Sequence, residues 1–350
     1  MKRYFIPLII ITVVYGQDTK QVITERHDNR NKKLVFEYKG EGIDEELVAK
    51  YGFYENGLKE FVEEYKNNLK DGLNKKWYKN GQKKIEGNYK NNKMNGEWTY
   101  YFENGIVEAK GSFLNGDGTD LNKNSGIPNN GRNGKWIGYH ENEGIRRWEG
   151  TFKDGNLDGL FTSWHENGKK NAEITYMYGK VDGLFKRWHK NGQKYAEGNY
   201  KDGNIDGFGT TWDENGQKTS EGTYKDGKTH GKLTNYDSDG NITTIEQYRE
   251  GDLHGIQTRF WKNGNKYNES EYQDGKMRGI YVLYYPNGQK KISGKIGLHW
   301  KKWKGFNEDG SQMKRKDFKK EMIELGLTTS NTTKLLNAIK TIDEVTKPLQ

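Results

Sequence analysis

The apolar positions of this chain recur at a fixed interval, and most of them are aromatic. Asn-Gly, or a close equivalent, recurs with its glycines 24 residues apart from Gly57 to Gly105 and again from Gly144 to Gly288. An aromatic residue stands eight positions after nearly every one of these glycines, and a second stands four positions before. Self-similarity at a period of this length is the signature of a repeat architecture.

Each repeat predicts two short strands joined by tight turns. A second turn, such as Asp202-Gly203, lies midway between successive Asn-Gly pairs, such as Asn191-Gly192. Both dipeptides between β-rich segments favour two-residue hairpin loops of type I′, whose central residues need positive φ. The expected fold is all-β: an elongated single-sheet antiparallel meander of 24-residue β-hairpin repeats. It is solenoid-like, because each unit packs on its neighbours rather than around one central core.

The turn position also predicts the register of the strands. A two-residue loop at Asn191-Gly192 pairs Tyr200 with Gly183 and Phe185 with Gly198. In both pairs an aromatic ring lies over a cross-strand glycine and takes the place of its missing side chain. Because side chains alternate between the two faces of a strand, Trp188 falls on the face opposite Tyr200 and Phe185.

The chain divides by composition and periodicity into four parts. Residues 50–310 hold about ten repeats and an insertion at 116–130, which we interpret as a surface loop. Asp117 and Asp120 in that insertion invite a calcium interpretation, but the pattern lacks the glycine and distal glutamate of an EF-hand. Residues 17–49 are predicted to be an N-terminal cap or degenerate repeat, with a strand at 34–38. Residues 311–350 are predicted to be a C-terminal helical cap or tail, with helices at 316–325 and 333–345, that covers the open sheet edge.

Residues 1–16 predict a secretory signal peptide. Lys2 and Arg3 precede an apolar run from Tyr4 to Tyr15 that ends at Gly16, and this run is short for crossing a bilayer. We therefore expect an exported protein, whether periplasmic, at the cell surface or secreted. The chain has no cysteine, so it is not a Cys-anchored lipoprotein and has no disulfide or thiolate metal site.

Composition narrows the class of protein further. The sequence contains 45 Gly but only 4 Pro, and its 10 Trp, 23 Tyr and 13 Phe are too many for a disordered chain. Its 58 basic and 49 acidic residues give a net charge of +9 and are interspersed. Such a pattern is typical of a solvated surface, so we do not expect nucleic-acid binding.

Candidate catalytic groups follow the repeat rather than forming a separate constellation. His140, His165 and His189 share one repeat position, and glutamates such as Glu197 recur five residues after the turn glycine. Residues placed by the period serve the repeat, and the glutamates are expected to pair across strands with lysines on the exposed surface. The sequence therefore predicts no enzyme, and no catalytic, metal or cofactor-binding residue.

One aromatic row is the candidate binding site. Evenly spaced rings can stack on sugar faces or anchor a protein partner, but they can also pack on one another to hold a thin sheet together. The row, four residues before each turn glycine, comprises Trp164, Trp188, Trp212, Tyr236, Phe260 and Tyr284.

These repeats resemble the MORN repeat, most closely its bacterial variant. The matching segments include residues 191–203 and 80–89, and about ten near-periodic copies carry the resemblance over residues 50–310. The resemblance implies an elongated sheet of β-hairpins used for protein association. Many bacterial members carry the label of antitoxin component of a toxin–antitoxin system, and eukaryotic relatives are linked to membranes and phosphoinositides.

The function expected from the sequence is therefore binding. We expect a non-enzymatic exported scaffold or adaptor with an unknown protein partner. Polysaccharide or cell-wall binding through the aromatic row is the alternative, and an antitoxin-like neutraliser of a partner protein is a second. Binding of membrane head groups through lysines is a minor further possibility.

Overall fold

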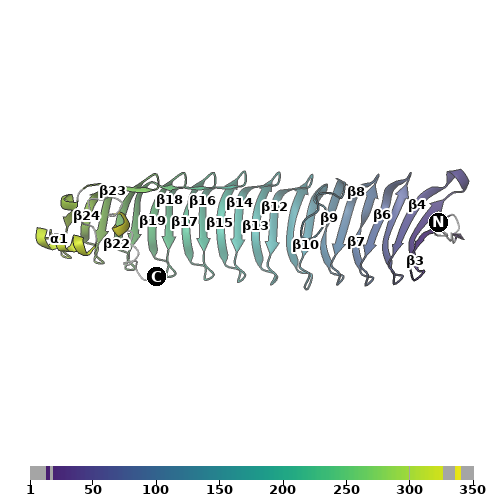
Figure 1. The fold of residues 1–350 in the computed structure, drawn as a ribbon, viewed down its shortest axis with the longest axis horizontal. Helices are drawn as coiled ribbons and strands as arrows, with labels where there is room; N and C mark the ends of the chain where they lie inside the picture. Colours follow the sequence, from purple (N-terminus) through teal and green to yellow (C-terminus); the bar gives the residue numbers. More distant parts are fainter. Residues whose placement is uncertain (1–12, 16–18, 299, 326–335, 340–350) are drawn as a thin grey trace, which may run out of the picture. The chain divides into compact units, whose positions relative to one another are not determined.

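The computed structural model describes residues 13–15, 19–298, 300–325 and 336–339. It divides into two compact units, Met1–Lys180 and Val181–Gln350, and each is an antiparallel meander (Figure 1). The predicted signal peptide lies outside the described residues, except for the backbone of Val13–Tyr15.

Unit 1 contains thirteen strands and one turn of 3-10 helix, and the predicted degenerate repeat at 17–49 contributes strands to its sheet. Every strand pairs antiparallel with the next one in sequence. The elements are β1 (Val13–Tyr15), β2 (Thr19–Arg26), β3 (Lys32–Lys39), the 3-10 turn Gly42–Asp44, β4 (Glu46–Phe53), β5 (Lys59–Lys66), β6 (Leu69–Trp77), β7 (Lys83–Lys90), β8 (Lys93–Tyr101), β9 (Val107–Gly116), β10 (Arg132–Tyr139), β11 (Arg146–Lys153), β12 (Asn156–Trp164) and β13 (Lys170–Met177).

Unit 2 continues the same pattern and ends in a helix. Its first strand begins at the boundary residue Lys180. The elements are β14 (Lys180–Trp188), β15 (Lys194–Lys201), β16 (Asn204–Trp212), β17 (Lys218–Lys225), β18 (Lys228–Tyr236), β19 (Ile242–Arg249), β20 (Asp252–Leu253), β21 (Gly255–Phe260), β22 (Lys266–Gln273), β23 (Lys276–Tyr284), β24 (Lys290–Ile296), a 3-10 turn at Trp300–Lys302, β25 (Lys304–Gly305) and α1 (Arg315–Glu324). Strands adjacent in sequence pair with one another, except that β20 and β21 both pair with β19.

The two kinds of turn differ, and the prediction is correct for only one of them. At Asp202-Gly203 both residues have positive φ, 50° and 89°, as a type I′ loop requires. At Asn191-Gly192 only the glycine is left-handed, with φ 91°. The backbone carbonyl of His189 accepts a hydrogen bond from the Gly192 N–H at 2.9 Å, and the backbone N–H of His189 donates to the Gln193 carbonyl. The Asn-Gly turns are therefore three-residue loops with a glycine bulge, and the type I′ prediction is wrong there.

The predicted register is nevertheless correct. Tyr200 pairs with Gly183 and Phe185 with Gly198. The longer loop shifts the pairing by one residue, and a bulge at Tyr195 shifts it back, because Trp188 pairs with Lys194 whereas Arg187 pairs with Ala196.

The repeated asparagine connects one turn to the next. Its side-chain oxygen accepts the N–H two residues on, as Asn191 Oδ1 does from Gln193 at 2.9 Å. Its amide nitrogen donates to a carbonyl in the following turn, 23 residues on, as Asn191 does to Glu214. The same bond recurs from Asn56, Asn80, Asn263 and Asn287. Asparagine is therefore required here by the stacking of turns as well as by the loop.

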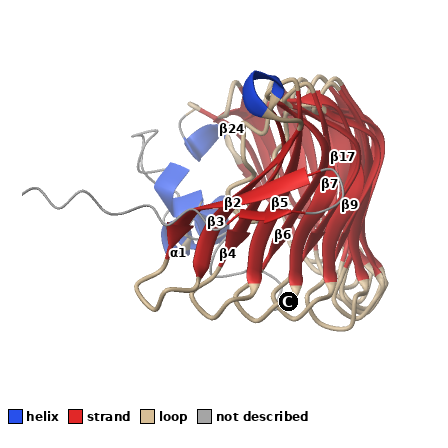
Figure 2. Ribbon diagram, turned by 90° about the vertical axis from the view of Figure 1, so that its right-hand side faces the viewer, coloured by secondary structure: helices blue, strands red, loops and turns tan. Residues whose placement is uncertain are grey.

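The two faces of each sheet differ in burial. We call the face that carries Tyr200 and Phe185 the inner face, and the face that carries Trp188 the outer face. In unit 1, Figure 2 shows strands β4–β9 curving. The inner face of unit 1 holds a buried cluster of Met94, Trp98, Tyr100, Ala109, Phe113, Ile127, Trp136 and Phe152. Ile127 belongs to the insertion, so the segment predicted as a plain surface loop folds back and covers β8–β11.

Rings do cover glycines, but from a different strand than expected. The ring over a glycine belongs to the following strand: Trp98 lies over Gly87, and Trp136 over Gly111. Phe185 is not what limits Gly198, whose added Cβ would meet Ile205 at 3.5 Å. Gly183 itself has φ 112°, so backbone conformation, and not a ring, demands glycine there.

In unit 2 the C-terminal helix covers the inner face at its last strands, β22–β24. Phe318 and Met322 of α1 are buried against Tyr281, Ile292 and Trp303. Lys291 on β24 pairs with Glu321 on α1 at 2.6 Å. The helix predicted at 316–325 is confirmed, but it packs on a face of the sheet rather than on its edge. Of the second predicted helix, only residues 336–339 are described, and they are helical.

Candidate binding surfaces

The candidate aromatic row lies on the outer face. Five of its rings, from Trp164 to Phe260, are half-buried, and Tyr284 is 9% exposed. The ring-to-ring contacts of the inner face are denser: Trp98 contacts Tyr89 and Phe113 edge-on, and Phe185 lies 5.0 Å from Tyr200. The rings of the candidate row therefore do not form the main core, and their role in binding stays a prediction.

Lysine and glutamate side chains surround the candidate row. Lys194 pairs with Trp188, and its ammonium group lies 5.4 Å from the ring centre of Trp212 in the next repeat. Lysines bond to the glutamate three residues on, as Lys218 does to Glu221 at 2.8 Å. The pairing predicted for these glutamates is thus present, partly along the strand and partly across it.

Two tyrosines of the row bond to those glutamates. Tyr236 donates to Glu221 at 2.6 Å, and Tyr284 donates to Glu269. Burial and then the carboxylate raise the pKa of Tyr236 to about 12, and the same two causes raise the pKa of Tyr284. The row is therefore tied into the outer face by hydrogen bonds.

A second row of apolar side chains on the outer face is far more exposed. It lies four residues before the candidate row. In unit 2, Leu184 is 39%, Phe208 53%, Ile256 47% and Ile280 49% exposed, and Lys232 stands at the remaining position. Leu160 holds the same position in unit 1 and is 56% exposed.

A repeated bulge presents these exposed side chains. In β16, Asp206, Gly207 and Phe208 together oppose the single residue Asn199 of β15. The Asp206 carboxylate accepts the Asp226 N–H of the next turn at 3.3 Å. Bulges turn side chains out of the regular pleat, so the strand offers Phe208 to the solvent from a backbone that is held on both sides.

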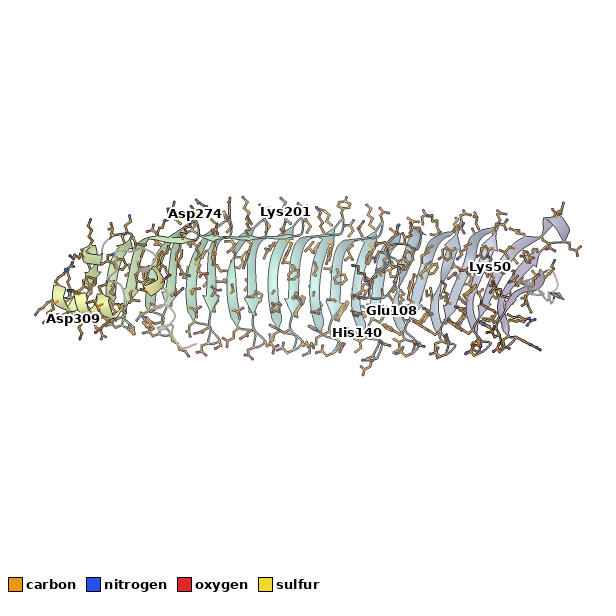
Figure 3. All side chains as sticks on the ribbon, in the orientation of Figure 1. Lys50, Glu108, His140, Lys201, Asp274 and Asp309 are labelled. Carbon is orange, nitrogen blue, oxygen red and sulfur yellow. The ribbon has the colours of Figure 1, made fainter. Side chains whose placement is uncertain are left out.

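The side chains at the turn edge of unit 2, such as Lys201 and Asp274, are visible in Figure 3.

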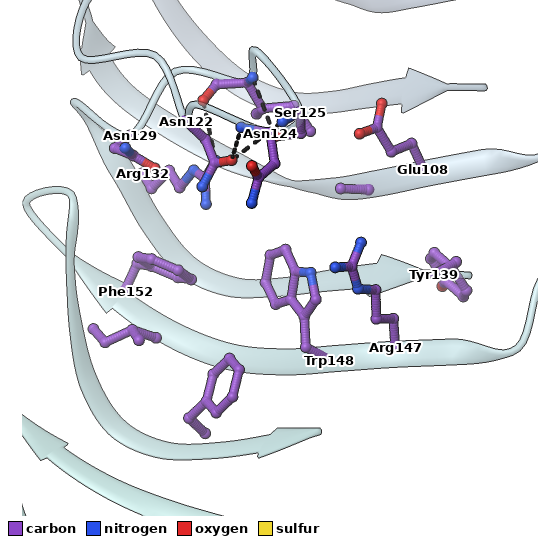
Figure 4. A pocket seen from close by; sticks show the side chains of 14 residues that line it. Glu108, Asn122, Asn124, Ser125, Asn129, Arg132, Tyr139, Arg147, Trp148 and Phe152 are labelled. Atoms are coloured by element: carbon purple, nitrogen blue, oxygen red, sulfur yellow. Dashed lines mark hydrogen bonds between the residues drawn. The ribbon is translucent and has the colours of Figure 1, made fainter. Parts of the chain in front are cut away.

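Unit 1 contains a cavity of about 330 Å³ under the insertion. Figure 4 shows the asparagines of the insertion on one side and the rings of β11 on the other. Its lining includes Arg132, Trp148, Phe152, Leu157, Phe161, Glu108, Arg147, Tyr139, Asn122, Asn124 and Asn129.

Arg132 is the most unusual group in this lining. It is 5% exposed, and its Nε donates to the Pro128 carbonyl at 2.8 Å. Its guanidinium lies 4.7 Å from the ring centre of Trp136 and 5.3 Å from that of Phe152. Burial lowers the pKa of Arg132 to about 10, and no carboxylate in the described part of the chain forms an ion pair with it.

Sequence reasoning missed this cavity, because the insertion reads as a polar loop. The available signal was Ile127-Pro128, the apolar pair inside fifteen otherwise mostly polar residues. Asp117, which invited the calcium interpretation, instead accepts hydrogen bonds from Thr119 and Asn130, both at 2.9 Å. Across the residues that the structure describes, no three His, Asp or Glu side chains gather closely enough to hold a metal ion.

The periodic histidines have structural partners. His140 and His189 donate from Nε2 to the carbonyls of Trp164 and Trp212 at 3.1 and 3.0 Å. Tyr54 and Tyr78 make the same bond from their hydroxyls at the same repeat position. These side chains therefore connect successive repeats.

Comparison with known proteins agrees with the repeat. Six segments match the MORN repeat variant, three in each unit: residues 70–91, 94–115, 157–177, 181–202, 207–226 and 253–274. These six segments are therefore similar to the MORN repeat variant, a repeat that is generally involved in protein or membrane binding. No curated protein matches the chain. Within the described residues, no helix is long and apolar enough to span a bilayer.

Several solved structures also match. One is the crystal structure of TcdB2-TccC3-Cdc42, 8% identical over 83% of this chain and 17% of the other, with a TM-score of 0.19. Another is the Photorhabdus luminescens Tc holotoxin pore, 10% identical over 84% of this chain and 16% of the other, with a TM-score of 0.16. The chain spans about a sixth of the length of the chains it matches.

Proposed function

We propose that this protein is a non-enzymatic scaffold that holds a protein partner on the outer face of unit 2. The observation that carries the proposal is the exposed apolar row of Leu184, Phe208, Ile256 and Ile280, which hold one repeat position on either side of Lys232. Exposed apolar side chains aligned on one face among polar neighbours are typical of protein interfaces, whereas singly scattered ones are not.

The row fits a protein partner better than a sugar chain. Its neighbours across the strands are small and polar, such as Asn199 beside Leu184 and Thr223 beside Phe208. Phe208 is the single ring among the four apolar side chains of this row, whereas a series of rings that could stack on a sugar belongs to the candidate row, where the Lys194 ammonium lies over Trp212. The predicted signal peptide supports a partner outside the cytoplasm, and this part of the proposal rests on sequence alone.

A pull-down with matched variants tests the proposal. The full chain, Phe208→Asp and Tyr178→Asp are each used as bait against envelope extract of the native host, with quantification of every retained protein. Tyr178 is 73% exposed in a turn where other repeats carry aspartate, so its variant adds the same charge away from the row. We expect one stoichiometric partner with the native chain and with Tyr178→Asp, and at least tenfold less with Phe208→Asp.

Two results would overturn the proposal. One is equal retention of the partner by Phe208→Asp, with its melting temperature unchanged. The other is that no protein is retained at physiological salt by any of the three baits.

A further inference from the structure

We propose that the cavity of unit 1 binds a carboxylate-bearing sugar unit of hexuronic-acid size, with Arg132 as the partner of the carboxylate. This site lies on the inner face and needs no protein partner, so the inference goes beyond the proposed scaffold function and does not depend on it.

The first argument is the buried charge of Arg132. Two of its nitrogens donate to loop carbonyls, Nε to Pro128 at 2.8 Å and Nη2 to Ile127 at 3.4 Å. Its remaining N–H donors have no acceptor in the described part of the chain, although the side chain lines the cavity. Buried charges are normally paired, and the guanidinium fork matches a carboxylate in shape and charge.

The second argument is the apolar wall opposite the insertion. Trp148, Phe152, Leu157 and Phe161 line it, with the Trp148 and Phe161 rings stacked at 6.3 Å. The face of a pyranose ring that carries C–H groups is apolar and flat, so it can contact such rings. The cavity volume of about 330 Å³ lies at the small end of the range for ligand sites, which suits a single sugar unit.

The third argument is the set of polar groups that the insertion contributes to the cavity, opposite the apolar wall. Asn122 Oδ1 already accepts the N–H groups of Asn124 and Ser125, at 3.0 and 3.2 Å, which leaves its amide nitrogen to donate. The side-chain amides of Asn124 and Asn129 have no hydrogen-bond partner among the described residues.

Glu108 and Arg147 line the same cavity. Burial raises the pKa of Glu108, and Arg147 opposes that rise. Amides and a carboxyl supply donors and acceptors together, as sugar hydroxyls require, whereas a lone acidic side chain from a peptide would use only the arginine.

Titration with small probes tests the inference. The full chain is titrated with glucuronate, galacturonate, glucose and N-acetylglutamate, and binding is followed by tryptophan fluorescence and by saturation-transfer NMR on the probe. We expect saturable binding of at least one uronate. It should be at least tenfold tighter than binding of glucose, which lacks the carboxylate, and of N-acetylglutamate, which lacks the ring hydroxyls.

Variants of the lining separate binding from folding. Asn124→Ala should weaken uronate binding about threefold to tenfold and leave the melting temperature unchanged, because its side chain makes no hydrogen bond to any residue that the structure describes. Lys123→Ala, an exposed neighbour in the insertion that does not line the cavity, should change neither. Arg132→Gln should abolish the preference for uronate over glucose. Because Arg132 also holds the insertion, this variant is interpreted only where its melting temperature stays near that of the native chain.

Three outcomes would overturn the inference. Uronates could bind no tighter than glucose, which would remove Arg132 as a carboxylate partner. N-acetylglutamate could bind as tightly as the uronates, which would point to a peptide. Asn124→Ala could bind the uronate as tightly as the native chain, which would place the sugar elsewhere.

Discussion

Replacing Gly87 by alanine tests whether a ring from the following strand occupies the space above a glycine. A Cβ added at Gly87 would lie 2.1 Å from Cδ2 of Trp98. Carbon atoms in ordinary contact are about 3.5–4.0 Å apart, so the indole would have to move by roughly 1.5 Å. Trp98 is 2% exposed and wedged edge-on between Tyr89 and Phe113, and its Nε1 donates to the Asn88 carbonyl at 3.1 Å.

The magnitude follows from three effects. Overpacking of a filled core costs about 1–3 kcal/mol. Loss of the hydrogen bond from Trp98 adds about 0.5–1.5 kcal/mol. Replacing glycine by alanine also lowers the entropy of the unfolded chain, and this effect offsets about 0.4–1 kcal/mol of the lost stability. We therefore expect Gly87→Ala to destabilise the protein by about 0.5–4 kcal/mol.

Gly198→Ala is the matched control. Gly198 stands at the same repeat position, but its partner on the following strand is Gly209, and an added Cβ would first meet Ile205 at 3.5 Å. Only the entropic effect remains, so this variant should be neutral or more stable by about 0.4–1 kcal/mol. The two variants of one repeat position are thus expected to change stability in opposite directions.

Urea unfolding followed by circular dichroism measures both effects. Hydrogen exchange at the amides of β7 and β8 gives a local measure, because arrays of repeats need not unfold in a single step. If Gly87→Ala is as stable as the native protein, the indole does not lie over the glycine and the argument fails. A double variant with Trp98→Leu should recover part of the loss, because the smaller side chain leaves room for the added methyl group.

Three further predictions concern bonds within and between repeats. Asn191→Ala removes one bond within its turn and one to the next turn, and chemical denaturation should show a loss of about 1–3 kcal/mol; a loss below about 0.5 kcal/mol would contradict the role of the turn ladder. Hydrogen bonds from Lys75 and then from a second lysine lower the pKa of Glu86, so the stability it contributes is present at neutral pH and is lost as the pH falls through its folded pKa. The stability curves of the native protein and Glu86→Gln should therefore converge in acid, and parallel curves would argue against the ion pairs. The pKa of Tyr236 is raised to about 12, so folding favours its protonated form, and its contribution to stability is lost as the pH rises from 10.0 toward that value. Ultraviolet titration of Glu221→Gln should move one phenol back toward 10.0, and an unchanged titration would mean that burial alone sets this pKa.

The strand order and register were predictable from the sequence because they are local. Antiparallel neighbours are joined by short turns, so the position of a turn such as Asn191-Gly192 sets which residues face each other. The pairing of Tyr200 with Gly183 follows from that position, even though the loop is one residue longer than expected and a bulge compensates for it. The 24-residue period and the helix at 316–325 could be recognised on the same local grounds.

The candidate row could be located along the chain but not assigned a role. Alternation places Trp188 and Phe185 on opposite faces, and the pattern on each face is equally aromatic. Which face is more buried depends on what packs against it. In unit 1 the insertion packs against the inner face through Ile127. In unit 2, α1 packs against the inner face through Phe318 and Met322.

The sequence therefore encodes the repeat: its period, the all-β class, the neighbours of each strand and the faces of their side chains. The tertiary structure alone decided what lies between distant segments. Asn191 bonds to a turn 23 residues away, and Arg132 is buried under a loop that reads as polar, with no ion pair to the residues that the structure describes. The bond of Asn191 depends on the spacing of stacked strands, and the burial of Arg132 depends on how the insertion folds back. Neither feature is encoded in local propensity or periodicity.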